Sequence, residues 1–476
     1  MLDDSEIQAI AAGSWRLECS SIRLKRRGSV APTTLTGPGF VDQAPDGSLR
    51  FTMFPNVPWS RDWKPLSMIE LPDGGFIPKD LFYQWSAEDL HGRSWASDQV
   101  LPEPSVFIPR ATSVWHSRLA SMTAERARPT PGTEFVLTCV SVVPLDFPAN
   151  EPTHTTISGP LWPIKSFAHD RARAMPIGIK CDLHTSGAKS TLVATGSAPM
   201  RLDLASVLAE SLQFVLAAPV IWAVTMCRAD VERTTIDSRA LVAAKVSRPY
   251  RLHRPVPGGA VQTPGDTWQL FERYAEYIST TSGPERHPLA AEFRGVLDGS
   301  AASIESQALV TSVAVESVIR QLIAPKAGGT SGELSAVIAA LTAVLDTQQC
   351  DPSVKKRVTG ALDALQHSRA IDVLYDLATQ GAVTKEQITA WKKLRNPSSH
   401  GTGHLSRRAE VTVRRIDCVT TLLYVLVFYL VGYDGYYTDC CMKPPQTLRY
   451  AVTPVAGSSA GIGDGSPPEP GSNASY

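Results

Sequence analysis

The first half of the chain alternates hydrophobic and polar residues in short segments that proline and glycine separate. These segments are rich in β-branched and aromatic residues, a pattern typical of strands with one buried face. The clearest expected strands cover residues 15–24, 49–54, 135–143, 177–183 and 191–195. One helix is expected at 202–215, followed after Pro219 by an apolar strand at 220–227. The pattern predicts a β-rich, sandwich or barrel-like domain over residues 1–247.

The pattern changes after residues 248–265, which are rich in proline and glycine and which we interpret as a linker. Beyond them, hydrophobic residues recur at the 3.6-residue spacing of amphipathic helices. The expected helices cover residues 268–279, 304–323, 334–345, 352–365, 370–378, 384–394 and 405–430. Their short connections predict an antiparallel helical bundle over residues 266–450. Residues 451–476 are mostly Gly, Ser and Pro, which predicts a disordered tail. The expected fold class is α+β with several domains.

Length and composition narrow the possible functions. The 476 residues exceed the roughly 250–300 that a single core can serve, which agrees with at least two domains. The 46 basic and 46 acidic side chains cancel, which excludes a protein that coats nucleic acid through its overall charge. Eight cysteines without regular spacing, and no targeting segment, predict reduced thiols in a cytoplasmic protein. The apolar runs 214–226 and 422–431 are interrupted or too short, so no membrane span is expected.

Candidate chemistry lies in residues 383–401. The spacing predicts a capping box and then a buried stripe, formed respectively by Thr384 with Gln387 and by Ile388, Trp391 and Leu394. Pro397 lacks an N–H and disfavours helical geometry before it, so the helix is expected to end at Leu394 or Arg395. On an uninterrupted helix Arg395 and His400 would lie about 140° apart around the axis. A loop there would let both side chains point into one cleft.

The same region is locally basic. Between positions 385 and 415 there are two acidic residues, Glu386 and Glu410, and eight basic ones, Lys385, Lys392, Lys393, Arg395, Arg407, Arg408, Arg414 and Arg415. A polyanion could dock on such a surface. The alternative is that the lysines are the solvated faces of two amphipathic helices.

The segment Leu-Arg-Asn-Pro-Ser-Ser-His-Gly at 394–401 resembles the Arg-Asn-x-x-x-His signature of the HEPN superfamily of small helical domains, many of which are ribonucleases. The resemblance covers roughly residues 268–435. It includes an earlier apolar helical segment, residues 313–319, with a lone acid, Glu316, and a final helix that runs into residues 432–437. A β-rich domain before such a bundle resembles the layout of the ApeA-like subgroup of bacterial anti-phage proteins.

The resemblance implies an endoribonuclease site made of Arg395, Asn396 and His400. A ribose 2′-hydroxyl would attack the adjacent phosphate and leave a cyclic phosphate and a 5′-hydroxyl, with no metal or other cofactor. Histidine, with an ordinary pKa of about 6.5, exchanges protons near neutrality. Arginine stabilises charge that builds on phosphate oxygens, and Asn396 would bind phosphate or orient His400. DNA lacks the attacking hydroxyl and is expected to be inert.

The resemblance also implies partners. One histidine per chain supplies one of two proton-transfer roles, and HEPN proteins usually pair their motifs across a shared cleft. We therefore expect a homodimer or higher even oligomer that acts on RNA. The expected RNA contacts are Lys392, Lys393, Arg407 and Arg408. The β-rich half would sense a trigger, such as a phage product, or restrain the nuclease. The competing function is a non-catalytic HEPN-type scaffold that binds RNA or dimerises.

Glu316 has two interpretations of similar weight. A carboxylate on an apolar helix is costly to bury unpaired, so it could orient Arg395 or His400. Alternatively, Ser312, Glu316 and Arg320 form an exposed stripe in which Glu316 pairs with Arg320. Other chemistries lose support because the sequence has no phosphate-binding loop, zinc-protease motif, nucleophile elbow or Cys-x-x-Cys pair. Cys181 and His184 should face opposite sides of one strand, which argues against a shared metal.

Overall fold

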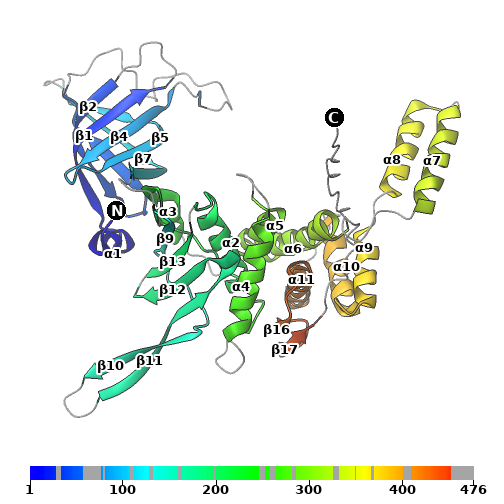
Figure 1. The fold of residues 1–476 in the computed structure, drawn as a ribbon. Helices are drawn as coiled ribbons and strands as arrows, with labels where there is room; N and C mark the ends of the chain where they lie inside the picture. Colours follow the sequence, from blue (N-terminus) through cyan, green and yellow to red (C-terminus); the bar gives the residue numbers. More distant parts are fainter. Residues whose placement is uncertain are drawn as a thin grey trace, which may run out of the picture.

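The computed structural model combines a large antiparallel sheet with a helical bundle (Figure 1). It describes residues 1–27, 34–56, 77–78, 81–107, 112–127, 132–158, 163–187, 189–197, 199–245, 252–257, 264–280, 286–324, 332–348, 350–365, 369–399 and 409–451. The sheet occupies the N-terminal part and the bundle the C-terminal part. This confirms the expected α+β layout at that level.

The sheet contains 15 described strands, all paired antiparallel. They are β1 (Arg16–Arg26), β2 (Thr34–Gln43), β3 (Leu49–Met53), β4 (Tyr83–Asp89), β5 (Ser94–Val100), β6 (Glu103–Phe107), β7 (Thr112–Leu119), β8 (Ser121–Ala127), β9 (Glu134–Ser141), β10 (Glu151–Ser158), β11 (Pro163–Ala174), β12 (Lys180–Ser186), β13 (Lys189–Ser197), β14 (Val224–Arg228) and β15 (Val231–Asp237). Their order is β10-β11-β12-β13-β9-β14-β15-β8-β5-β4-β1-β2-β3-β7-β6. β5 and β7 contact each other although four strands separate them in this order, so this end of the sheet curls on itself.

Alternating burial along the strands explains why these segments form sheet. In β1, Leu17, Cys19, Ile22 and Leu24 point inward and the intervening residues are exposed. The alternation slips between Cys19 and Ile22, where the register with β2 shifts as at a β-bulge. In β12, Cys181 is buried and His184 is exposed, as expected for positions three apart on a strand.

Helices cover the sheet and form the bundle. They are α1 (Asp4–Ala12), α2 (Leu204–Leu216), α3 (Ser238–Lys245), α4 (Pro264–Ile278), α5 (Pro288–Ser300), α6 (Ile304–Val318, continued by a π-turn at Ile319–Ile323), α7 (Gly332–Thr347), α8 (Pro352–Leu365), α9 (Ala370–Thr379), α10 (Lys385–Ser399) and α11 (Ala409–Val431). A short 3₁₀ turn, Pro176–Gly178, precedes β12, and a hairpin of β16 (Gly435–Asp439) and β17 (Gln446–Tyr450) follows α11. Every helix expected from the 3.6-residue pattern is present, whereas α1, α3 and α5 were not expected.

Two buried cores hold the molecule together. One lies inside the curled end of the sheet, under α1 and α3. The other combines β9, β11–β13 and α2 with α4, α5, α6, α9, α10 and α11. The ring of Phe214 on α2 marks the junction, because its centroid lies 4.4 Å from that of Tyr274 on α4 and 4.9 Å from that of Phe293 on α5. The second core thus joins the sheet to the bundle.

The cores do not divide at the expected linker, residues 248–265. Its described residues 252–257 pack on the bundle: Val256 is buried, and the hydroxyl of Tyr424 on α11 donates to the carbonyl of His253 at 2.6 Å. The N–H of Thr438 on β16 donates to the carbonyl of Pro255 at 2.9 Å. Proline keeps this segment out of regular structure without keeping it out of the core.

The centre of the bundle is α11, whose side chains from Ile416 to Phe428 are mostly buried. These side chains pack against neighbouring elements in the second core. Within the described ranges, no helix is both long enough and apolar enough to cross a membrane. α7 and α8 behave differently. They form a hairpin that stands away from the bundle (Figure 1), and Val337, Leu341 and Val344 of α7 are exposed.

Candidate functional site

α10 carries Arg395 and Asn396 of the Arg-Asn-x-x-x-His segment, and it begins with the capping box expected from the sequence. The N–H of Gln387 donates to the hydroxyl of Thr384 at 3.2 Å, and the N–H of Thr384 donates to the side-chain oxygen of Gln387 at 2.9 Å. This reciprocal pair confirms the capping box. Ile388, Trp391 and Leu394 are each 2% exposed or less, which confirms the buried stripe.

The expected end of this helix is wrong. α10 continues through Pro397 to Ser399 instead of stopping at Leu394 or Arg395. A proline removes one backbone hydrogen bond, the one its own N–H would make four residues back, and in the last turn that loss is small. Packing of Trp391 and Leu394 against the bundle holds the preceding turn in place. The loop that would bring Arg395 and His400 together therefore does not begin where it was expected.

Arg395 is held by contacts with Glu316 and Trp391. Its Nε and Nη2 donate to the two carboxylate oxygens of Glu316 on α6, at 2.7 and 3.1 Å. Its guanidinium carbon also lies 5.6 Å from the ring centroid of Trp391, one turn earlier. The indole N–H of Trp391 in turn donates to the carbonyl of Ser312 on α6 at 3.1 Å. α6 and α10 are thus joined by packing, a hydrogen bond and a bidentate ion pair.

Glu316 pairs both with Arg395, as one interpretation expects, and with Arg320, as the other expects. Besides Arg395, it forms an ion pair with Nη2 of Arg320 at 2.7 Å, so one carboxylate bridges two guanidinium groups. Its side chain is 18% exposed, against 44% for Arg395 and 62% for Arg320. Ser312, however, is buried and its hydroxyl donates to the carbonyl of Ala308, so the expected exposed stripe does not include it. The carboxylate lies at the edge of the buried surface with the two cations outside it.

The other expected site residues are only partly described. Lys392 and Lys393 are exposed on α10, Arg414 is exposed on α11, and Arg415 is half-buried there. Asn396 lies in α10, but its side chain is outside the described part of the structure. His400, Arg407 and Arg408 also lie outside the described residues. The structure therefore positions Arg395 and Glu316 and leaves the distance from Arg395 to His400 a prediction.

Metal binding finds no support in the described side chains: within the ranges given above, no three His, Cys, Asp or Glu residues cluster closely enough to hold an ion. The chemistry open to the described part of the site is electrostatic. A positioned guanidinium binds phosphate or carboxylate oxygens in a bidentate manner.

The cysteines correct one expectation. Cys418 on α11 and Cys441 after β16 form a disulfide, although all eight cysteines were expected to be reduced. The β16–β17 hairpin folds back along α11 and brings their Cα atoms to 4.3 Å, a proximity that sequence spacing does not reveal. Cys440 is buried and unbridged, and burial raises the pKa of its thiol to about 12.

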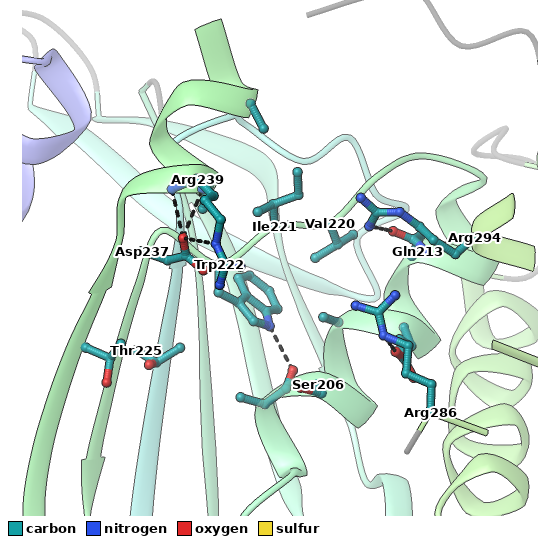
Figure 2. Close-up of a pocket in the computed structure, with 16 residues that line it drawn as sticks. Ser206, Gln213, Val220, Ile221, Trp222, Thr225, Asp237, Arg239, Arg286 and Arg294 are labelled. Atoms are coloured by element: carbon teal, nitrogen blue, oxygen red, sulfur yellow. Dashed lines mark hydrogen bonds and ion pairs between the residues drawn. The ribbon is translucent and has the colours of Figure 1, made fainter. Parts of the chain in front are cut away.

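Sequence reasoning missed a cavity of about 570 Å³ where the sheet meets the bundle (Figure 2). The sheet side contributes α2, β14, β15 and α3, and the bundle side contributes Arg286 and Arg294. Arg286 pairs with Glu210 on α2 at 3.1 Å, and Nη1 of Arg294 donates to the side-chain oxygen of Gln213 at 3.0 Å. Burial outweighs these cations and raises the pKa of Glu210. The available signal was Glu210, an acid in the middle of the apolar helix expected at 202–215.

Each cation that lines this cavity already has an anionic or amide partner. The third one, Arg239 on α3, lies 3.5 Å from Asp237, and Arg294 also pairs with Asp298 at 3.3 Å. The polar side chains that line the cavity therefore pair with one another, and two of these pairs join the bundle to α2.

No family model matches this chain, and comparison with the curated proteins and with the solved structures gives no match either.

Proposed function

We propose that this chain is a metal-independent endoribonuclease with a HEPN-type site, in which Arg395, Asn396 and His400 act on RNA. The observation that carries the proposal is the bidentate ion pair between Arg395 and Glu316. It fixes a half-exposed guanidinium on the last turns of α10, five residues before His400 in the sequence. Glu316 of α6 is the residue that holds it, which is one of the two roles expected of this carboxylate.

The reaction under this proposal is an internal transesterification. The 2′-oxygen forms a bond to phosphorus while the bond from phosphorus to the 5′-oxygen breaks. The proton of the 2′-hydroxyl passes to a base, and the departing 5′-oxygen takes a proton from an acid. His400 supplies one of these transfers and His400 of the partner subunit the other. Arg395 stabilises the charge that grows on the non-bridging oxygens.

A role in an anti-phage or toxin-like system belongs to the same proposal. The β-rich half would restrain the nuclease or respond to a trigger. The shared core supports this coupling, because Phe214 of the sheet side packs on Tyr274, Phe293 and Tyr424 of the bundle. Because these side chains are tightly packed, a change in the sheet that moves α2 would also shift α4, α5 and α11.

The same ion pair also favours the competing function, a non-catalytic HEPN-type scaffold. Glu316 neutralises Arg395, and a bridged guanidinium can be purely structural. In that case the exposed lysines 392 and 393 would bind RNA without cutting it.

Binding and cleavage of RNA, measured on the same preparations, separate the two functions. The purified chain, Arg395→Ala and His400→Ala are incubated with mixed RNA, alone and with extract from phage-infected cells as a source of trigger. We expect His400→Ala to retain binding and to lose cleavage by at least about 10²-fold. Binding by the unaltered chain without cleavage under either condition would establish the scaffold.

A further inference from the structure

The α7–α8 hairpin exposes large aliphatic side chains that a monomer would normally bury. Val337, Leu341 and Val344 on α7 and Val354 and Val358 on α8 are between 40% and 56% exposed. Ile338 on α7 and Leu362 on α8 are buried, at 1% and 9% exposed. The hairpin stands clear of the rest of the molecule (Figure 1). Isolated helices of this length are marginal in water, so a hairpin that leaves these aliphatic side chains exposed needs further packing.

The exposed residues lie on one face of the hairpin. In α7, Val337, Leu341 and Val344 lie about 60–120° around the axis from Ile338, at 100° per residue. In α8, Val354 and Val358 lie about 40–80° from Leu362, in the same rotational sense. The burial of Ile338 and Leu362 indicates that these two positions mark the sides on which the helices face each other. Because the helices of a hairpin run antiparallel, rotations in the same sense from these positions bring both stripes to the same side. The result is a two-helix apolar surface.

We propose that this surface is the contact with a second copy of the chain, and that two hairpins form an antiparallel four-helix bundle. The two-fold axis runs parallel to the helices, so α7 packs on α8 of the partner subunit. Charge favours this arrangement: α7 carries two acidic residues and no basic one, whereas α8 carries three basic residues and one acidic. Packing α8 on its own copy would instead bring like charges together.

The lengths of the helices also fit this partner. α7 has 16 residues and α8 has 14, so each stripe spans a similar height. Leu341 and Val358 are equally far from the middle of the connection and therefore meet across the interface. A face about 24 Å long and two helices wide buries on the order of 1,000 Å² in total, the lower bound for a specific dimer. We expect dissociation in the micromolar range.

The first test is the mass of the full chain in solution over a range of concentrations, measured by light scattering or sedimentation. We expect dimers at tens of micromolar for the unaltered chain. The double variant Leu341→Gln with Val344→Gln should raise the dissociation constant at least tenfold, without loss of helix because glutamine is a good helix former. The matched control, Ala339→Gln with Ala343→Gln, changes the opposite face of α7 and should remain dimeric. A monomer at all concentrations, an unaffected double variant, or a dissociated control would overturn the proposal.

The second test fixes the arrangement. In a Cys350→Ser background, Leu341→Cys and Val358→Cys are prepared as separate proteins and mixed under oxidising conditions. Cross-linking only in the mixture supports α7 on α8 of the partner subunit, whereas cross-linking of Leu341→Cys alone shows the other packing. Neither test uses Arg395 or RNA. A dimer that forms through the hairpins without cleaving RNA would support this surface while the ribonuclease fails, and a dimer that forms through another surface and cleaves RNA would do the reverse.

Discussion

Glu316 shows how one carboxylate orders a candidate site. It binds Arg395 from another helix and Arg320 from its own, while its position at the rim of the core limits its contact with water. The sequence identified the residue because an acid on an apolar helix needs a partner. It left two partners open because the choice depends on how α6 and α10 pack.

Replacing Glu316 with Gln should impair cleavage much more than folding. The free energy of unfolding should fall by about 1 kcal/mol or less, because both guanidinium groups are substantially exposed. RNA cleavage should fall about tenfold to a hundredfold, through kcat more than KM, because Arg395 is no longer held. Glu316→Asp should recover part of the rate. Unchanged kcat in Glu316→Gln, with Arg395→Ala inactive, would remove Glu316 as a positioning residue.

Asp89 is a buried acid of the sheet whose carboxylate is fully hydrogen-bonded. Its carboxylate has no exposed surface, and it accepts from Nε of Arg93 at 2.6 Å and from the indole of Trp95 at 3.0 Å. Nη2 of Arg93 also forms an ion pair with the carboxylate of Glu6 on α1, at 2.7 Å. Burial alone would raise the pKa of Asp89, but the hydrogen bonds from Trp95 and Arg93 outweigh it and lower that pKa.

Asp89→Asn should destabilise the protein by about 3 kcal/mol at neutral pH, because it leaves Arg93 partly unpaired. Because the folded pKa is lowered, the contribution of the carboxylate is complete above the ordinary aspartate pKa of about 3.9 and is lost as pH falls further. Denaturant unfolding at several pH values should therefore show a gap between the two proteins that closes below about pH 4. Asp98→Asn, which removes the exposed pair with Arg27, is the control and should cost under 1 kcal/mol. A gap that does not depend on pH would contradict the assignment.

At the scale of elements, α5 and α6 pack closely at Gly299. A Cβ there would overlap the side chain of Val310 on α6, whereas a Cβ at Gly295, four residues earlier, meets open space. Gly299→Ala should cost about 1–3 kcal/mol through overpacking. Gly295→Ala in the same helix should stabilise by about 0.5–1 kcal/mol, because alanine loses less backbone entropy. Thermal unfolding of the two variants checks this, and equal shifts in Tm would refute the close contact.

The elements that sequence predicted are those whose own hydrophobic pattern determines them. α8 was expected at 352–365 and is found there, because its apolar stripe is regular. α5 was missed because Pro288, Gly295 and Gly299 resemble loop punctuation, although the proline begins the helix and one glycine serves the contact with α6. The hydrophobic pattern predicts the helix α7 but not the exposure of Val337, Leu341 and Val344, since a pattern does not show what covers an apolar face.

At the scale of the whole molecule, the second core makes the bundle dependent on the sheet. α2 contributes Leu208, Leu212 and Phe214 to the core that surrounds α4, α5 and α11. The linker was recognisable from composition, but composition does not reveal which side chains cross it. For the same reason the sequence offers Arg395, 79 residues away, only as one possible partner of Glu316, and the packing of α6 on α10 brings the two together.

A fragment of residues 252–451 should therefore not fold cooperatively. Without α2 and β9–β13 it exposes one side of its core, so we expect broad unfolding by circular dichroism and strong binding of a hydrophobic dye. A fragment of residues 132–451 regains the missing elements and should unfold in a single sharp transition. If the shorter fragment unfolds as sharply as the longer one, the shared core is not needed for the bundle to fold.

The central claim is that Arg395 and His400 cleave RNA without a metal. Its most direct test is the chemical nature of the ends formed when the full chain is incubated with RNA in excess chelator. The claim predicts 2′,3′-cyclic phosphate and 5′-hydroxyl ends that are absent with His400→Ala, and no cleavage of DNA of the same sequence. Cleavage that requires added metal, or that persists in His400→Ala, would contradict it.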